Sequence, residues 1–205
     1  MKIILLGAPG SGKGTLAERI NEGLGLVHIS TGDIFRRNIR QETPIGLAAK
    51  EYIDKGMLAP DEVTIELVRL TLSGIGDNYM LDGFPRTIAQ AEALESFAGK
   101  DIIALNLEVD FAVLADRISG RRSCLECGYT THVSKMTDDR CPKCGKEVIQ
   151  RRDDNEETVK NRLAVYAEKS APLIGYYADK GTLVNVDGMG TPDEVWARAK
   201  KVLEN

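Results

Sequence analysis

The chain has 205 residues, of which 42% are hydrophobic and 28% are charged, and its formal net charge is −4. This composition is typical of a folded globular protein with one sizeable core and room for a small appendage. The acidic balance argues against a general nucleic-acid binder, which would show a basic excess. No apolar run approaches the roughly 20 residues that span a bilayer, and the first residues do not resemble a signal peptide. We therefore expect a cytoplasmic protein that binds neither nucleic acid nor membranes.

Short apolar runs alternate with amphipathic segments along most of the chain. The predicted strands are Lys2–Leu6, Val27–Ile29, Tyr79–Leu81, Ile102–Glu108 and Thr182–Val186. The predicted helices are Gly12–Leu24, Asp33–Arg40, Ile45–Lys55, Asp61–Leu72, Ile88–Phe97, Phe111–Ser119, Glu157–Tyr177 and Pro192–Leu203. This alternation predicts an α/β fold with a doubly wound, five-stranded parallel sheet. Ligands of such sheets bind beyond the carboxyl ends of the strands.

The first predicted strand runs directly into a glycine-rich stretch that is followed by a helical pattern. The stretch reads Gly7-Ala8-Pro9-Gly10-Ser11-Gly12-Lys13-Gly14-Thr15. It predicts a phosphate-binding loop, because converging backbone N–H groups at a helix N-terminus bind anions and Lys13 adds a cation. The alternative is an ordinary glycine-rich βα turn. Gly14 separates Lys13 from the hydroxyl of Thr15, which departs from the usual order of this motif and leaves the magnesium role of the hydroxyl open.

Residues 121–152 interrupt the alternation, because the helical period disappears and cysteines, glycines and charged residues take over. Two C-x-x-C pairs lie in this segment, Cys124 with Cys127 and Cys141 with Cys144, thirteen residues apart. This spacing is typical of a structural zinc ribbon, in which four thiolates fill the coordination sphere. A redox-active dithiol, free thiols and iron in place of zinc remain as alternatives. The segment is predicted to be a small subdomain stabilised by the metal, or a lid.

Several motifs outside the phosphate loop resemble motifs of one protein family. They are Ser30-Thr31-Gly32-Asp33-x-x-Arg36, Asp82-Gly83-Phe84-Pro85-Arg86-Thr87, Arg151-x-Asp153-Asp154-x-x-x-Thr158-Val159 and Ala171-Pro172-Leu173-Ile174-x-Tyr176-Tyr177. In this order and spacing they resemble the adenylate kinase family over nearly the whole chain, in the long-lid branch in which some members carry a zinc site. The resemblance implies a P-loop NTPase-type fold and reversible phosphoryl transfer from Mg-ATP to AMP, giving two ADP.

The resemblance also implies a division of the chain and roles for single residues. The core would comprise residues 1–120 and 153–205, with an AMP-binding helical segment at 30–59 and a zinc-binding lid at 121–152. The implied catalytic residues are Lys13, Arg86, Arg121, Arg151 and Arg162. The implied ATP-binding residues are Gly10, Ser11, Gly12, Lys13, Gly14, Thr15, Arg117 and Arg121. The implied AMP-binding residues are Thr31, Arg36, Met57, Ala59, Gly83, Arg86, Gln90, Arg151 and Arg162.

Magnesium would accompany ATP, and two carboxylates are candidates to hold it. Asp82 follows a predicted strand and faces the phosphate loop, and Asp33 is the second candidate, directly or through water. Asp33 is equally well interpreted as a helix cap. His132 is expected on the nucleotide side of the lid, and Trp196 in the core.

Two other functions remain open on the sequence. One is a non-catalytic P-loop switch or zinc-ribbon adaptor, which would leave Arg36, Arg86 and Gln90 without a use. The other is a pyrimidine monophosphate kinase, which shares the reaction and differs in the acceptor. We expect a monomer.

Overall fold

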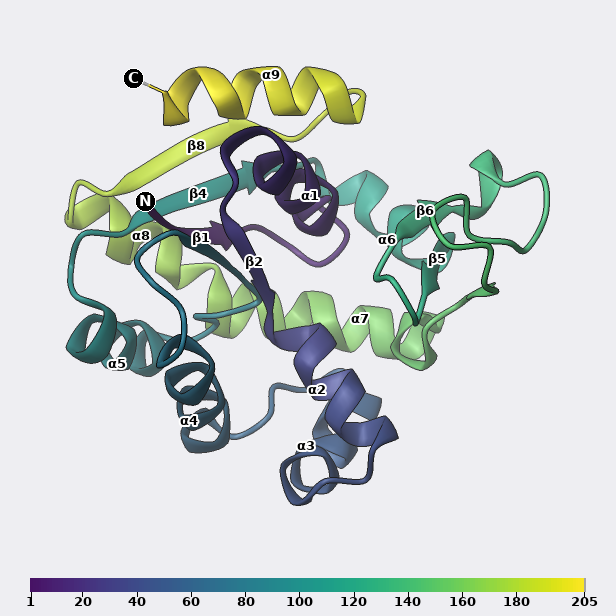
Figure 1. Ribbon diagram of the computed structural model, residues 1–205, viewed down its shortest axis with the longest axis horizontal. Helices are drawn as coiled ribbons and strands as arrows, with labels where there is room; N and C mark the ends of the chain where they lie inside the picture. Colours follow the sequence, from purple (N-terminus) through teal and green to yellow (C-terminus); the bar gives the residue numbers. More distant parts are fainter. Residues whose placement is uncertain (205) are drawn as a thin grey trace.

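The computed structural model describes residues 1–204 of the chain, and its centre is a five-stranded parallel sheet (Figure 1). The strands are β1 (Lys2–Leu6), β2 (Val27–Ser30), β3 (Tyr79–Asp82), β4 (Ile103–Glu108) and β8 (Leu183–Asp187). Their order is β2-β3-β1-β4-β8, and every neighbouring pair is parallel. The predicted α/β fold is confirmed. Because β1 lies in the middle, the glycine-rich stretch after it lies at the centre of the carboxyl edge of the sheet.

Nine α-helices connect the strands or flank them within the described residues. They are α1 (Lys13–Leu24), α2 (Thr31–Arg40), α3 (Pro44–Asp54), α4 (Asp61–Leu72), α5 (Ile88–Ala98), α6 (Phe111–Ser119), α7 (Glu156–Val165), α8 (Pro172–Asp179) and α9 (Pro192–Leu203). The helix predicted over residues 33–40 begins two residues earlier. Ser30 caps it, because its hydroxyl accepts a hydrogen bond from the N–H of Asp33 (3.2 Å). The interpretation of Asp33 as the helix cap is therefore wrong.

The single helix predicted over residues 157–177 is also wrong, because the structure divides it into three parts. α7 is followed by a π-helical segment, Tyr166–Ser170, and then by α8. The N–H of Ala171 donates to the carbonyl of Tyr166 (2.8 Å), five residues earlier. Pro172 has no N–H for a bond back to the preceding turn, and it occupies the first turn of α8, where none is needed.

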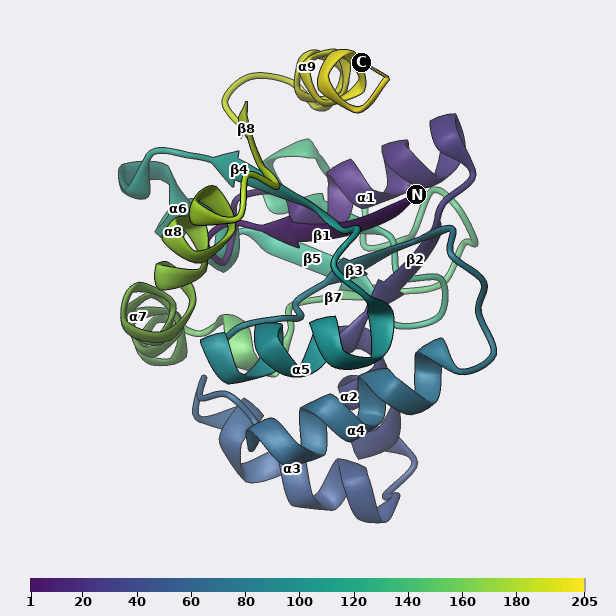
Figure 2. The same cartoon turned by 90° about the vertical axis from the view of Figure 1, so that its left-hand side faces the viewer.

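The sheet is covered on both faces, because alternate residues of each strand point to opposite sides. Ile3 and Leu5 of β1 pack with α1 and α9, whereas Ile4 and Leu6 pack with α4, α5 and α8. Figure 2 shows α1 on one side of the sheet and α8 on the other. Trp196 of α9 packs against the first of these clusters, as predicted. No helix within residues 1–204 is long and apolar enough to cross a membrane.

Two smaller units extend from the sheet. α2 and α3 lie together beyond β2 (Figure 1), and Phe35 and Ala49 from these helices form a small apolar cluster with Leu67 of α4. The second unit contains the antiparallel strands β5 (Arg121–Cys124), β6 (Thr130–His132) and β7 (Val148–Ile149), in the order β6-β5-β7. Its buried core consists of Cys124, Cys141 and Val148, with Tyr129 and Met136 partly buried against them. This is a very small apolar core for a unit of this length.

Two helical glycines allow a matched test of the packing of α2 against α3. A methyl group at Gly46 would overlap with the backbone of Asn38 on α2, whereas one at Gly175 of α8 would meet open space. Alanine is favoured over glycine by about 1 kcal/mol in a helix interior, and overpacking costs about 1–3 kcal/mol. We expect Gly175→Ala to raise the melting temperature by about 2–4 °C and Gly46→Ala to lower it. Equal shifts of the two variants in thermal unfolding would contradict this packing.

Candidate functional site

The glycine-rich stretch forms a cradle of backbone N–H groups at the start of α1. Gly10 and Gly12 have φ values of 82° and 99°, in the left-handed region that favours glycine. A methyl group at Gly10 would also lie 2.7 Å from the side chain of Ile118. Gly12 is the N-cap of α1, and no side chain of the described chain caps that helix or places a carboxylate in its first turn. The N–H groups of Lys13, Gly14 and Thr15 thus remain available to an anion.

Lys13 lies inside this cradle, and its environment disfavours its positive charge. Its Nζ donates to the carbonyls of Gly7 (2.7 Å) and Ala8 (2.9 Å). The pKa of Lys13 is lowered to about 8, mainly by burial; Asp82 opposes this shift, whereas Arg86, Arg162 and Arg121 add to it. A bound polyanion would remove this penalty, because it would supply the negative charge that the cluster lacks.

The four arginines predicted to be catalytic come from separate parts of the chain, and their charges act on one another. Burial and neighbouring arginines lower the pKa of Arg86 to about 10 and that of Arg151 to about 9. Burial, with Arg121 and Arg36 nearby, also lowers the pKa of Arg162. These guanidinium groups influence one another and Lys13, so the structure brings the predicted cationic residues together in one buried cluster.

Two carboxylates hold part of this cluster in place. Asp154 is fully buried and accepts hydrogen bonds from Arg121 (Nε, 2.8 Å) and from Arg162 (Nη1, 2.8 Å). Asp153 accepts a second bond from Arg162 (2.9 Å). Burial lowers the pKa of Arg121, but its bonds to Asp154 outweigh this effect and raise the pKa above its ordinary value. Arg151 is held separately, by a bond from its Nε to Ser123 Oγ (2.8 Å).

A pocket that is partly open to solvent lies beside the cationic cluster. Eight of the nine residues predicted to bind AMP line it, and Arg151 is the exception. The eight are Thr31, Arg36, Met57, Ala59, Gly83, Arg86, Gln90 and Arg162.

Gln90 has a contact pattern that the sequence did not reveal. Its Oε1 accepts the N–H of Arg86 (2.8 Å), and its Nε2 donates to Asp61 (2.7 Å). Asp61 also accepts a hydrogen bond from the Thr87 hydroxyl (3.0 Å). The amide of Gln90 therefore orders the loop that carries Arg86 as well as lining the pocket.

The two carboxylates predicted near magnesium differ in their surroundings. Asp82 lies beside the phosphate loop and 3.5 Å from Nε2 of His28. Burial raises the pKa of Asp82, but His28, Lys13 and Arg86 outweigh it and lower the pKa below its ordinary range. Asp33 is instead paired with Arg36. Asp82 is thus an ionised oxygen ligand next to the cradle, whereas Asp33 already has a cationic partner.

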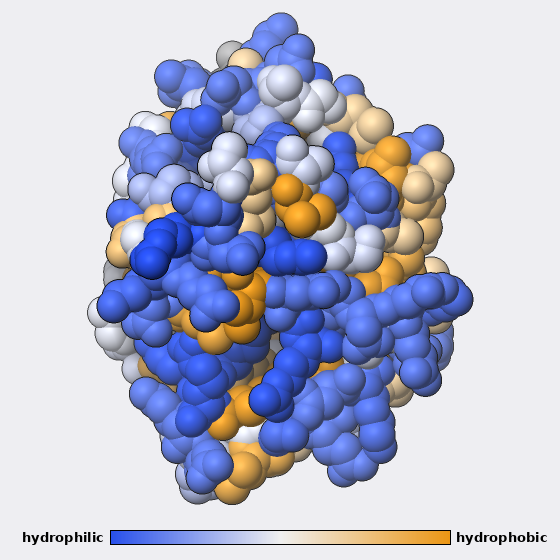
Figure 3. Space-filling model, turned by 90° about the vertical axis from the view of Figure 1, so that its right-hand side faces the viewer, coloured by the Kyte–Doolittle hydropathy of each residue, from blue (hydrophilic) through white to orange (hydrophobic). Residues whose placement is uncertain are grey.

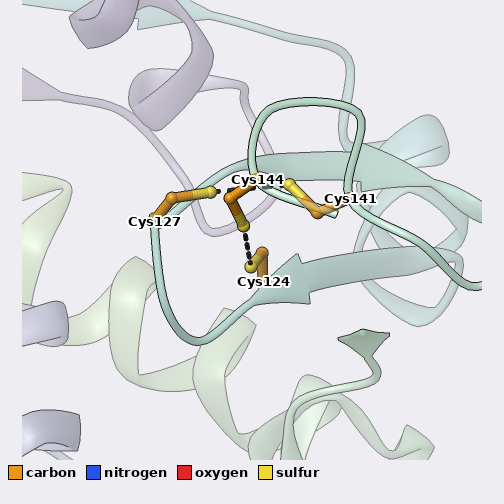
Figure 4. Close-up of side chains that lie close together, drawn as sticks. All are labelled: Cys124, Cys127, Cys141 and Cys144. Carbon is orange, nitrogen blue, oxygen red and sulfur yellow. Dashed lines mark hydrogen bonds between the residues drawn. The ribbon is translucent and has the colours of Figure 1, made fainter. Parts of the chain in front are cut away.

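The four cysteines lie close together, and their sulfur atoms face one another (Figure 4). All four Sγ atoms are within 4.8 Å of each other, and the Cys124–Cys144 and Cys127–Cys141 pairs are 3.5 Å apart. None of them forms a disulfide within the described chain. Tetrahedral zinc with bonds of about 2.3 Å would separate its sulfur ligands by about 3.8 Å. The donor set and its spacing therefore fit a four-thiolate metal site.

Two further predicted residues lie outside these groups. Arg117 is on α6, and its Nη2 is 4.0 Å from Sδ of Met189. His132 packs against Gly120 where β5 begins, and its ring bonds to Ser134 (2.7 Å). On the face of the molecule that includes β5 and β6, hydrophilic residues surround separate apolar groups (Figure 3).

Several residues of the site were missed in the sequence interpretation. Asp153 and Asp154 belong to one of the motifs named above, but the motif does not reveal that they bind arginines. Their position directly after Arg151 and Arg152 is the sequence signal that could have indicated this. Asp61, Ser123 and Ser170 had no sequence signal, because only the fold brings Ser123 and Ser170 to arginines and Asp61 to Gln90.

Comparison with known proteins agrees with this arrangement. Residues 5–182 match the family model described as adenylate kinase. The chain is 50% identical to the adenylate kinase of Bacillus licheniformis and 49% identical to that of Clostridium kluyveri, with 99% of this chain and 98% of each relative covered. The adenylate kinase of Clostridium botulinum is 47% identical over the same shares. The chain belongs to the adenylate kinase family.

Proposed function

We propose that this protein catalyses the reversible transfer of the terminal phosphoryl group of Mg-ATP to AMP, giving two ADP. The observation that carries the proposal is the cluster of buried cations between the phosphate cradle and the adjoining pocket. Burial and mutual repulsion hold the pKa values of Lys13, Arg86 and Arg151 below their ordinary values. Two polyanionic nucleotides, one in the cradle and one in the pocket, would neutralise such a cluster.

The cluster supports a mechanism of positioning and charge stabilisation. Lys13 and the loop amides would hold the phosphates of ATP, with Arg117 near its base, while Arg36 and Arg86 would hold the phosphate of AMP. Arg121, Arg151 and Arg162 would neutralise the charge on the phosphoryl group during transfer. Each guanidinium presents a planar set of donors that matches phosphate oxygens. No protein nucleophile is needed, because the acceptor is the phosphate oxygen of AMP.

Two metals fit the residues of the site. Mg²⁺, held by Asp82 directly or through water, would neutralise charge on the ATP phosphates. Asp33, paired with Arg36, would contribute only through water. Zn²⁺ would be held by the four cysteines and would stabilise the fold of the lid, because four thiolates leave no open position for catalysis.

We propose a core of residues 1–120 and 153–205, an AMP-binding segment at 30–59 and a lid at 121–152. Arg121 and Arg151, near the two ends of the lid, would move onto the phosphates when the lid closes and excludes water. One chain carries both nucleotide sites, which favours a monomer. A reaction on free nucleotides favours a cytoplasmic enzyme with no need for nucleic acid or membrane.

The proposal is tested by acceptor specificity. With Mg-ATP as donor, we expect the wild-type protein to phosphorylate AMP much faster than CMP or UMP, measured by chromatography of the nucleotides formed. Lys13→Met should fold normally and lose at least about 100-fold in kcat, because its charge acts on oxygens that gain negative charge in transfer. Equal or higher rates with a pyrimidine acceptor would reassign the acceptor pocket, and near-normal turnover of Lys13→Met would contradict the whole proposal.

The lowered pKa of Lys13 predicts proton uptake when the donor nucleotide binds. At pH 8.5 most of the Lys13 side chain is neutral in the free protein, since its pKa is about 8. A bound triphosphate raises that pKa, so Lys13 gains a proton, whereas at pH 6.5 it is already protonated. We expect calorimetry with a non-hydrolysable ATP analogue, in buffers of different ionisation enthalpy, to show this uptake at pH 8.5. In Lys13→Arg, which stays protonated, the uptake should be absent.

Metal removal should affect the lid more than the core. The lid has a very small apolar core, so its order should depend on the ion, whereas the sheet has large clusters of its own. We expect one zinc per chain by elemental analysis. Chelation, or Cys141→Ser with Cys144→Ser, should lower the melting temperature and the activity while most of the far-UV circular dichroism remains. A metal-free protein that melts and turns over like the native one would remove the zinc assignment.

A further inference from the structure

Arg86 is held by three hydrogen bonds, two to residues nearby in the chain and one to a distant residue. Its N–H donates to Gln90 Oε1 (2.8 Å), its side-chain Nε donates to the carbonyl of Gly83 (2.8 Å), and its own carbonyl accepts from Ser170 Oγ (2.9 Å). The N–H, the carbonyl and the Nε of Arg86 therefore all form hydrogen bonds within the protein. Within residues 1–204, Nη1 and Nη2 of Arg86 donate to no protein acceptor, and the side chain lines the pocket.

Ser170 comes from a distant and unusual segment. It lies 84 residues after Arg86, at the end of the π-helical segment between α7 and α8. Short π-helical segments are rare and are frequent at functional sites. Here the segment follows the helix that carries Arg162, and its wider turn sets the register of the residues after Tyr166. With that register, the hydroxyl of Ser170 reaches the carbonyl of Arg86.

We propose that Ser170 is a positioning residue for Arg86, an inference that rests on the proposed phosphoryl transfer. The Ser170 hydroxyl fixes the peptide after Arg86, and Gln90 fixes the peptide before it. Together they direct the two unbonded nitrogens of the guanidinium toward the phosphate of the acceptor nucleotide. A displacement of such a group by a fraction of an ångström weakens its interaction with the reacting oxygens.

The test compares three substitutions of Ser170 with a matched control. Ser170→Ala removes the hydroxyl, Ser170→Thr keeps it, and Ser170→Cys keeps the shape with a much weaker donor. The control is Ser96→Ala, because the Ser96 hydroxyl also donates to a backbone carbonyl, that of Ala93 (2.6 Å), but on the exposed side of α5. For each variant, kcat, KM for AMP, KM for ATP and the melting temperature are measured.

We expect Ser170→Ala and Ser170→Cys to lower kcat/KM for AMP by roughly three- to tenfold, which corresponds to the free-energy contribution of one hydrogen bond. The KM for ATP should remain unchanged. Ser170→Thr should retain most of the wild-type value, and Ser96→Ala should equal it. Unchanged kinetic constants in Ser170→Ala or Ser170→Cys, with or without a lower melting temperature, would overturn the inference, because the bond would then be only a structural tie. An equal loss for AMP and ATP would also overturn it. A wild-type protein that fails to phosphorylate AMP would contradict the proposed function instead.

Discussion

Repulsion among buried positive charges is the constraint on which this site depends. A cation removed from water is unstable unless a partner compensates it, and here one lysine and several arginines share a small volume. Asp82, Asp153 and Asp154 compensate them in part, as the lowered pKa values of Lys13, Arg86 and Arg151 indicate. The remaining positive charge is fixed in place before any ligand arrives. Such a preorganised site favours a polyanion whose negative charge grows during reaction.

The position of each cation depends on groups that are themselves buried. Asp154 joins Arg121, at the start of β5, to Arg162 on α7, so one carboxylate fixes the position of these two segments relative to each other. Removing either arginine would leave the buried Asp154 carboxylate with one cationic partner in place of two, which lowers the free energy of unfolding. The pairing is best understood as fixing geometry, since buried ion pairs contribute little net stability.

Apolar contacts are distributed unevenly over the molecule. The two faces of the sheet carry large apolar clusters, whereas the cluster of residues 121–152 is small, and α2 and α3 share a small cluster with α4 (Figure 1). Units with few apolar contacts can change position at low cost while the sheet remains folded. Four thiolates on one ion would keep residues 121–152 ordered, because metal bonds would replace the large apolar core that this segment lacks.

The sequence by itself determined the sheet, the phosphate loop and the cysteine site. These features depend on local patterns: alternation of apolar runs, glycines next to a lysine, and cysteines at fixed spacing. The resemblance to a family then identified eight of the fifteen residues that line the pocket beside the cationic cluster. The tertiary structure alone decided that Ser30 caps α2 and that the helix after residue 156 is divided near Tyr166. It also decided which partners hold the arginines, as Ser123 holds Arg151 and Ser170 holds Arg86, because contacts between residues far apart in the chain leave no periodic trace in the sequence.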